Sequence, residues 1–171
     1  MFERFTAREF GLLAAAAALF IDQASKLLLL YTFGFASMLP GTRITVLPFL
    51  DLVMAWNAGI SFSLFSSNSP GGIALLVTVG IAVIAALGWW MWNAMRTPLA
   101  IGLGLVIGGA LGNLVDRLVY GRVADFFDLH AMGRDFFACN PADVLISLGV
   151  LLLIYDSVMD SGVRAPVQGA E

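Results

Sequence analysis

Long apolar stretches, separated by short polar segments, dominate the chain. Four of them hold the roughly 20 apolar residues that a helix needs to cross a bilayer. We expect these helices over residues of about 10–31, 71–92, 98–115 and 141–158. The pattern predicts an all-α polytopic membrane protein that forms a single domain over residues 1–171, because the length leaves no room for a second one.

The fourth stretch has a short apolar core. Val144–Tyr155 is free of charge but covers only about 18 Å at about 1.5 Å per residue. The hydrocarbon layer is about 30 Å thick. One of the two flanking acids, Asp143 or Asp156, is therefore expected at or inside the membrane boundary.

The two long links, 32–70 and 116–140, lie on the same side of the membrane if there are four spans, and both termini lie on the other side. The first link contains Ile44–Trp56, whose β-branched and bulky apolar residues favour one or two strands. The second contains Val123–Leu129 and Asp135–Ala138, which suit a hairpin. Together they predict a small sheet on one membrane face.

The first apolar stretch begins like a secretory signal, because a short basic start precedes an alanine-rich run. The apolar character resumes over Leu27–Leu30, and no Pro or Gly marks a cleavage site. We expect the stretch to remain as the first helix.

The composition agrees with a membrane protein. Hydrophobic residues make up 60% of the 171 residues and charged residues 12%, against averages of about 45–50% and about 25% in soluble domains. A net charge of -3 with nine basic residues argues against nucleic-acid binding. One cysteine, Cys139, and one histidine, His130, exclude an internal disulfide and leave little for a metal site. We expect neither metal nor other cofactor.

Asp22 and Lys26 form a candidate charge pair in the first helix. Residues four apart share a helix face, so the two charges neutralise each other at a membrane depth where either alone is costly. The alternative is an interfacial pair whose lysine extends toward the headgroups.

Asn140, Pro141 and Asp143 open the predicted fourth helix. Asn is a favoured N-cap, Pro a favoured first residue, and an acid in the first turn suits the helix dipole. Taken alone, the segment Asn140-Pro-Ala-Asp143 is explained as a helix start.

Asp125 lies among large apolar residues, where burial raises a carboxyl pKa. If Asp125 and Asp143 meet, the two carboxyls are expected to share one proton near neutral pH. Aspartic peptidases use such a pair to activate water and to polarise the scissile carbonyl. Whether the two residues meet is left open by the residues alone.

Three other interpretations remain. Cys139 and His130 are candidates for a nucleophilic dyad across the predicted hairpin. A small transporter or proton channel requires ionisable residues spread through the membrane depth, and its candidates are Asp22, Lys26, Asp143 and Asp156. A purely structural membrane protein leaves the clustered Asn, Asp and Arg residues without a role.

Five polar blocks follow one another along the chain. They are Asp22-Gln-Ala-Ser-Lys26, Asn57-Ala-Gly-Ile-Ser-Phe62, Gly108-Gly-Ala-Leu-Gly-Asn-Leu-Val-Asp-Arg117, Val123-Ala-Asp-Phe126 and Asn140-Pro-Ala-Asp143. In order and spacing these blocks resemble those of the bacterial lipoprotein signal peptidases, also called signal peptidase II. The total length and the four predicted spans are also similar to that family.

The resemblance implies a membrane aspartic endopeptidase that removes the signal peptide from diacylglyceryl-modified prolipoproteins, on the N-terminal side of the lipidated cysteine. Its catalytic pair corresponds to Asp125 and Asp143. We expect a monomer whose partners are the lipid-modified substrate and membrane lipids. The supporting site residues are Asn57, Asn113, Asp116, Arg117, Asn140, Asp22 and Lys26.

The resemblance also implies an orientation, which the arginines leave open because four lie on each side. The protein is expected in the bacterial inner membrane, with both termini cytoplasmic and the small sheet and active site at the periplasmic face. Two residues depart from the family pattern: Cys139 replaces a bulky apolar or aromatic residue, and Pro141 an aliphatic one.

Glycines recur along the predicted third helix. Gly104, Gly108 and Gly112, at a spacing of four, give it a smooth face for close helix contact. Passage of a substrate chain close to Gly108, Gly109 and Gly112 is the alternative explanation.

Overall fold

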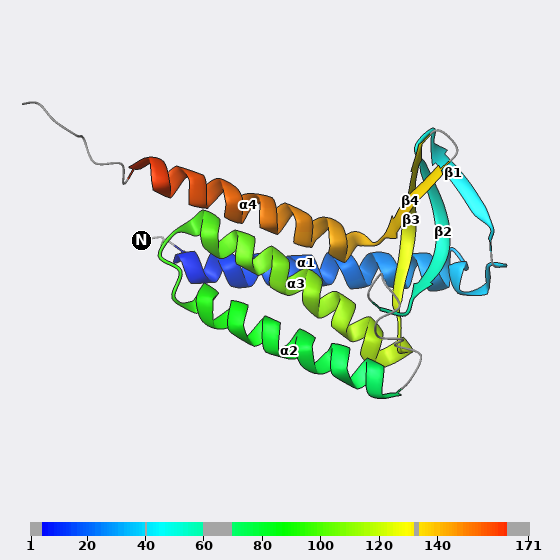
Figure 1. Cartoon of the computed structure of the whole chain (residues 1–171), viewed down its shortest axis with the longest axis horizontal. Helices are drawn as coiled ribbons and strands as arrows, with labels where there is room; N and C mark the ends of the chain where they lie inside the picture. Colours follow the sequence, from blue (N-terminus) through cyan, green and yellow to red (C-terminus); the bar gives the residue numbers. More distant parts are fainter. Residues whose placement is uncertain (1–4, 40, 60–69, 132–133, 164–171) are drawn as a thin grey trace, which may run out of the picture.

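The computed structural model describes residues 5–39, 41–59, 70–131 and 134–163. Four long helices lie side by side, and a small sheet crosses one end of the bundle (Figure 1). The helices are α1 (Ala7–Leu27, continued by a π-helical segment, Leu28–Thr32), α2 (Pro70–Trp92), α3 (Thr97–Tyr120) and α4 (Pro141–Val163). The strands are β1 (Arg43–Leu47), β2 (Leu50–Asn57), β3 (Val123–Ala131) and β4 (Arg134–Cys139).

All four predicted helices are present, and each is long and apolar enough to span a membrane. The bounds of α1, α3 and α4 differ from the prediction, and α4 continues past residue 158 to Val163. The first helix begins at Ala7, because Thr6 caps it: the Thr6 N–H donates to Glu9 Oε2 at 2.6 Å, in a capping box. The third continues past residue 115 to Tyr120 and ends at Gly121, whose φ of 70° favours glycine.

The sheet confirms the prediction for both links. Its four antiparallel strands lie in the order β1-β2-β3-β4, so the first link supplies one hairpin and the second link the other. Figure 1 shows the sheet at one end of the bundle, with the start of α1, the α2–α3 connection and the end of α4 at the opposite end. This is the arrangement that four spans require.

Glycines allow α3 to approach two helices closely. A Cβ on Gly108 would collide with Ala15 O of α1, and a Cβ on Gly109 would lie 2.7 Å from Ala142 O of α4. A Cβ on Gly112 would collide with the Asp22 carboxyl. These faces are filled by the neighbouring helices, so the glycines serve helix packing and the idea of a substrate path along them is wrong.

An apolar cluster anchors the sheet to the bundle. Phe126, which is fully buried, packs with Leu30, Phe35 and Ala124, and the Phe35 and Phe126 rings meet edge-on at 6.0 Å between centroids. Neighbouring residues in a strand point to opposite faces. The packing of Phe126 therefore determines which way the adjacent Asp125 points.

Candidate active site

Asp125 and Asp143 come from different elements, and the structure brings them together through Asn140. Asp125 lies in β3 and Asp143 in the first turn of α4. Asn140 Nδ2 donates to Asp125 Oδ1 at 2.6 Å, and the Asn140 backbone N–H donates to Asp143 Oδ2 at 3.1 Å. One asparagine therefore binds both carboxyls.

Two further asparagines complete the hydrogen bonding of this pair. Asn57, at the end of β2, donates from Nδ2 to Asp125 Oδ2 at 3.1 Å. Asn113, in α3, donates from Nδ2 to Asp143 Oδ1 at 3.0 Å. Each carboxyl thus accepts two N–H donors, and these donors come from separate parts of the fold.

The helix-start interpretation of Asn140 and Asp143 is confirmed, and it does not exclude a second role. Asn140 Oδ1 accepts from the Asp143 backbone N–H at 3.1 Å, while the Asp143 carboxyl accepts from the Asn140 backbone N–H. This reciprocal bonding is a capping box. The cap holds the Asp143 side chain in the orientation in which it lies near Asp125.

Burial raises the pKa of Asp125 to about 6. The hydrogen bonds from Asn140 and Asn57 lower the pKa, whereas the negative charge of Asp143 raises it further. The residue is 2% exposed. A carboxyl in this environment holds a proton over part of the range just below neutral pH.

A buried ionic cluster lies next to the two carboxyls. Lys26 Nζ lies 2.9 Å from Asp22 Oδ2 and 2.7 Å from Asp116 Oδ2, and all three side chains are at most 3% exposed. Lys26 therefore faces the protein interior, and the alternative of a lysine extending toward the headgroups is wrong. Lys26 Nζ also donates to Asn113 Oδ1 at 3.2 Å, which joins the cluster to the Asp125–Asp143 pair.

The same cluster positions the two elements that carry the pair. Asp22 Oδ1 accepts from the Ala142 backbone N–H at 3.0 Å, one of the N–H groups that the start of α4 leaves without a helical partner. Asp116 Oδ2 accepts from the Ala124 backbone N–H at 3.2 Å, next to Asp125 in β3. Loss of this cluster is expected to disturb both elements.

Gln23 is a residue of this cluster that the sequence pattern did not predict. Its Nε2 donates to Asp22 Oδ2 at 3.1 Å and to Asp116 Oδ1 at 3.2 Å, and also to the Gly112 carbonyl. The signal that could have indicated it is its position beside Asp22 in an otherwise apolar helix.

Arg117 lies half-buried at the same end of α3. Its Nη1 donates to the Asn113 backbone carbonyl at 3.1 Å, and its positive charge interacts with Asp116, Asp143 and Asp125. The predicted supporting residues therefore all lie around the Asp125–Asp143 pair. They are Asn57, Asn113, Asp116, Arg117, Asn140, Asp22 and Lys26.

The predicted alternative of a nucleophilic dyad formed by Cys139 and His130 is wrong. In the β3–β4 register Cys139 lies opposite Phe127, whereas His130 lies opposite Asp135, so the two residues are at different points along the hairpin. Burial, with a smaller effect from nearby carboxylates, raises the pKa of the Cys139 thiol to about 11. A nucleophilic cysteine requires the opposite shift.

Within the part of the chain that the structure describes, the acids also form no path through the bundle. Asp156 Oδ2 and Asp160 Oδ1 each lie 2.7 Å from a terminal nitrogen of Arg96, at the far end of α4. Asp156 is about 20 Å from Asp143 along the helix, at about 1.5 Å per residue. The helix between them is apolar, which is not the arrangement that a proton relay through the membrane requires.

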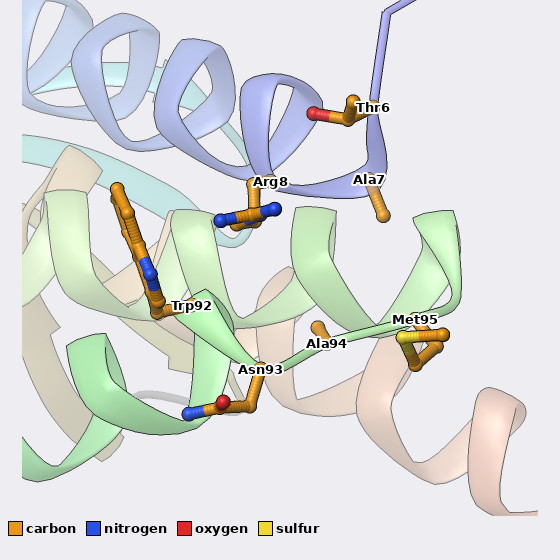
Figure 2. A pocket seen from close by; sticks show the side chains of 7 residues that line it. All are labelled: Thr6, Ala7, Arg8, Trp92, Asn93, Ala94 and Met95. Atoms are coloured by element: carbon orange, nitrogen blue, oxygen red, sulfur yellow. The ribbon is translucent and has the colours of Figure 1, made fainter.

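Cavities occur at both ends of the bundle. One of about 240 Å³ is bordered by Asp143 and Cys139. Another, of about 440 Å³, lies at the opposite end, where the Arg8 guanidinium lies over the Trp92 ring at 5.1 Å (Figure 2). None of the predicted site residues lines that second cavity, so the candidate site is at the sheet end.

Known proteins resemble this chain over most of its length. The family model described as signal peptidase (SPase) II matches residues 14–159. The lipoprotein signal peptidase of Rhodopseudomonas palustris is 47% identical over 153 residues, covering 87% of this chain and 92% of the relative. That of Nitrobacter hamburgensis is 43% identical over 153 residues, with the same coverage of 87% and 92%.

Two solved structures, both described as bacterial membrane enzymes, have a similar fold. The first has a TM-score of 0.76 and 26% sequence identity, and covers 94% of each chain. The second has a TM-score of 0.73 and 27% identity, covering 88% of this chain and 93% of the other. Since the family model and the curated relatives both span most of the sequence, the chain belongs to the signal peptidase II family.

Proposed function

We propose that the protein is a membrane aspartic endopeptidase that cleaves the signal peptide from diacylglyceryl-modified prolipoproteins, on the N-terminal side of the lipidated cysteine. The observation that carries the aspartic mechanism is the Asp125–Asp143 pair held by Asn140. The substrate class rests on the family and on relatives named lipoprotein signal peptidase.

In this mechanism Asp125 begins protonated and Asp143 ionised. Asp143 takes a proton from water as the water oxygen adds to the scissile carbonyl carbon, while Asp125 gives its proton to the carbonyl oxygen. When the C–N bond breaks, Asp143 returns its proton to the leaving amine and the diol returns one to Asp125. Both carboxyls are then ready for another cycle.

The environment of each carboxyl suits its assigned role. The raised pKa of Asp125 favours the protonated form that polarises the carbonyl. Asp143 accepts N–H donors from Asn113 and Asn140, which orient the carboxylate that takes the proton from water. Arg117 adds a positive charge close to both carboxyls.

A lipidated substrate accounts for a site at one membrane face. Its acyl chains lie in the bilayer, so the bond to be cleaved lies near the surface. The pair belongs to β3 and to the first turn of α4, and these elements meet at the sheet end of the helices (Figure 1). We assign this end to the periplasmic face of the bacterial inner membrane, with both termini cytoplasmic. The protein acts as a monomer, and exposed side chains such as Phe20 and Trp89 contact membrane lipids.

A cleavage assay tests the proposed function. The purified protein in detergent is given one prolipoprotein with and without its diacylglyceryl group. We expect cleavage of the lipidated form alone, before the modified cysteine, with product masses measured by mass spectrometry. Failure of the folded protein to cut either form would contradict the peptidase assignment, and proton flux in liposomes would then be measured.

The rate is expected to depend on pH in a bell shape. The alkaline limb of kcat/KM reports loss of the shared proton, so activity is expected to fall as the pH rises through about 6, the pKa of Asp125. Protonation of both carboxyls produces the acid limb. We expect the same profile with a metal chelator, and loss of activity with the chelator would contradict the aspartic mechanism.

A further inference from the structure

A mainly apolar cavity of about 240 Å³ lies beside Asp143, between the β3–β4 hairpin and the first turns of α4. The hairpin contributes Leu129, Phe137 and Cys139 to its wall. The helix contributes Asp143, Ser147 and Leu148. The proposed mechanism uses the two carboxyls and their hydrogen-bond donors, and it assigns no function to this cavity.

The local geometry explains why the cavity forms. Phe137 and Cys139 are two residues apart in β4, so they share a face, and Leu129 lies opposite Phe137 in the register. On α4, Asp143 and Ser147 are four residues apart and also share a face. Small side chains on both walls, Cys139 and Ser147, leave the space between the two faces open.

We propose that this cavity receives an apolar side chain of the signal peptide close to the scissile bond, and that Cys139 and Ser147 set the size of the side chain it accepts. The inference rests on the proposed function. Because Asp143 is part of the wall, an occupant lies within a residue or two of the cleaved bond.

The volume favours a side chain over lipid. Pockets for whole small molecules are about 300–1,000 Å³, so about 240 Å³ suits one side chain and is too small for two acyl chains. β4 is also the terminal strand of the described sheet, and an extended peptide beside such an edge presents alternate side chains to one face. Such a peptide directs one of its side chains toward the cavity.

Two substitutions fill the cavity from opposite walls. Cys139→Leu adds volume from the hairpin, and Ser147→Leu adds it from α4, where Ser147 is exposed and the change does not disturb the helix core. Val150→Leu is the matched control, because Val150 is an exposed α4 residue that does not line the cavity.

The test uses lipidated peptide substrates in which each of the three residues before the modified cysteine is Ala, Val, Leu or Phe. We expect wild-type protein to accept a large residue at one position. In Cys139→Leu and Ser147→Leu, kcat/KM for that large residue is expected to fall about tenfold or more relative to Ala. Val150→Leu is expected to keep the wild-type order of preference.

Two results would overturn the inference while the proposed function stands. The first is an unchanged order of preference in both filled variants, with wild-type protein still cutting the substrates. The second is a change in the dependence on acyl-chain length in place of side-chain size, which would assign the cavity to lipid. If wild-type protein cuts none of the substrates, the proposed function itself fails, and this inference fails with it.

Discussion

Replacing either Asp125 or Asp143 with Asn is expected to lower kcat/KM for a lipidated prolipoprotein about 1,000-fold or more. An amide neither takes a proton from water nor gives one to the carbonyl oxygen. Membrane insertion and abundance are expected to stay near normal, because an Asn side chain has nearly the same shape and keeps an oxygen for one of the two N–H donors at each position. The measurement is cleavage by the purified variants.

Stability provides an independent readout for Asp125→Asn. The raised pKa of Asp125 means that its contribution to folding is full below the pKa of an unfolded carboxyl and is lost as the pH rises through about 6. The Asn variant lacks this loss. Above pH 6 it is expected to unfold at a temperature equal to or higher than that of wild-type protein, although it is inactive.

Asp160→Asn is the matched control for the two catalytic substitutions. It makes the same chemical change at the far end of α4, where Asp160 pairs with Arg96 and is partly exposed. We expect it to retain cleavage activity. Turnover close to the wild-type rate in either purified variant, Asp125→Asn or Asp143→Asn, would remove that residue from the mechanism.

Of the single substitutions proposed here, Lys26→Met is expected to cause the largest loss in the free energy of unfolding. The change leaves the carboxylates of Asp22 and Asp116 buried without the lysine that lies within 3 Å of both. Removing one partner of a buried ion pair typically costs about 3–5 kcal/mol. We expect a much lower midpoint for unfolding in detergent and less protein in the membrane.

A triple variant separates charge from packing. Combining Lys26→Met with Asp22→Asn and Asp116→Asn removes the uncompensated charges and keeps an oxygen for each backbone N–H that the two acids bind. We expect it to recover much of the stability that Lys26→Met alone loses. A single variant as stable as wild-type protein would show that the buried cluster does not hold the helices together.

The cluster also explains where sequence reasoning about helix ends failed. The uncharged stretch that predicts the third span ends at Val115, just before Asp116 and Arg117. In the structure Asp116 is neutralised by Lys26, and Arg117 bonds to the Asn113 carbonyl, so neither residue ends the helix. Gly121, with its left-handed backbone, does.

The roles of Gln23 and the inward orientation of Lys26 could not be predicted for a different reason. Whether a polar residue on a membrane helix points inward depends on what a neighbouring helix offers it. Here α3 offers Asp116 and Asn113, with Gly112 allowing the close approach. Those partners are about 90 residues away along the chain, beyond the reach of any local pattern.

The sequence by itself determined the four helices, the placement of both long links on the same side of the bundle, and the presence of a small sheet. These follow from the length and period of apolar runs, which depend on local hydrophobicity and on the thickness of the bilayer. The cap at Asn140 also follows locally, since its bonding partners lie within one helical turn.

Only the tertiary structure decided that Asp125 and Asp143 meet, that Lys26 is buried between two acids, and that Cys139 and His130 stay apart. Each depends on hydrogen bonds, ion pairs or strand register between segments distant in the chain. Such contacts are selected by the packing of the whole bundle, because a buried polar group is stable only where another element supplies its partner.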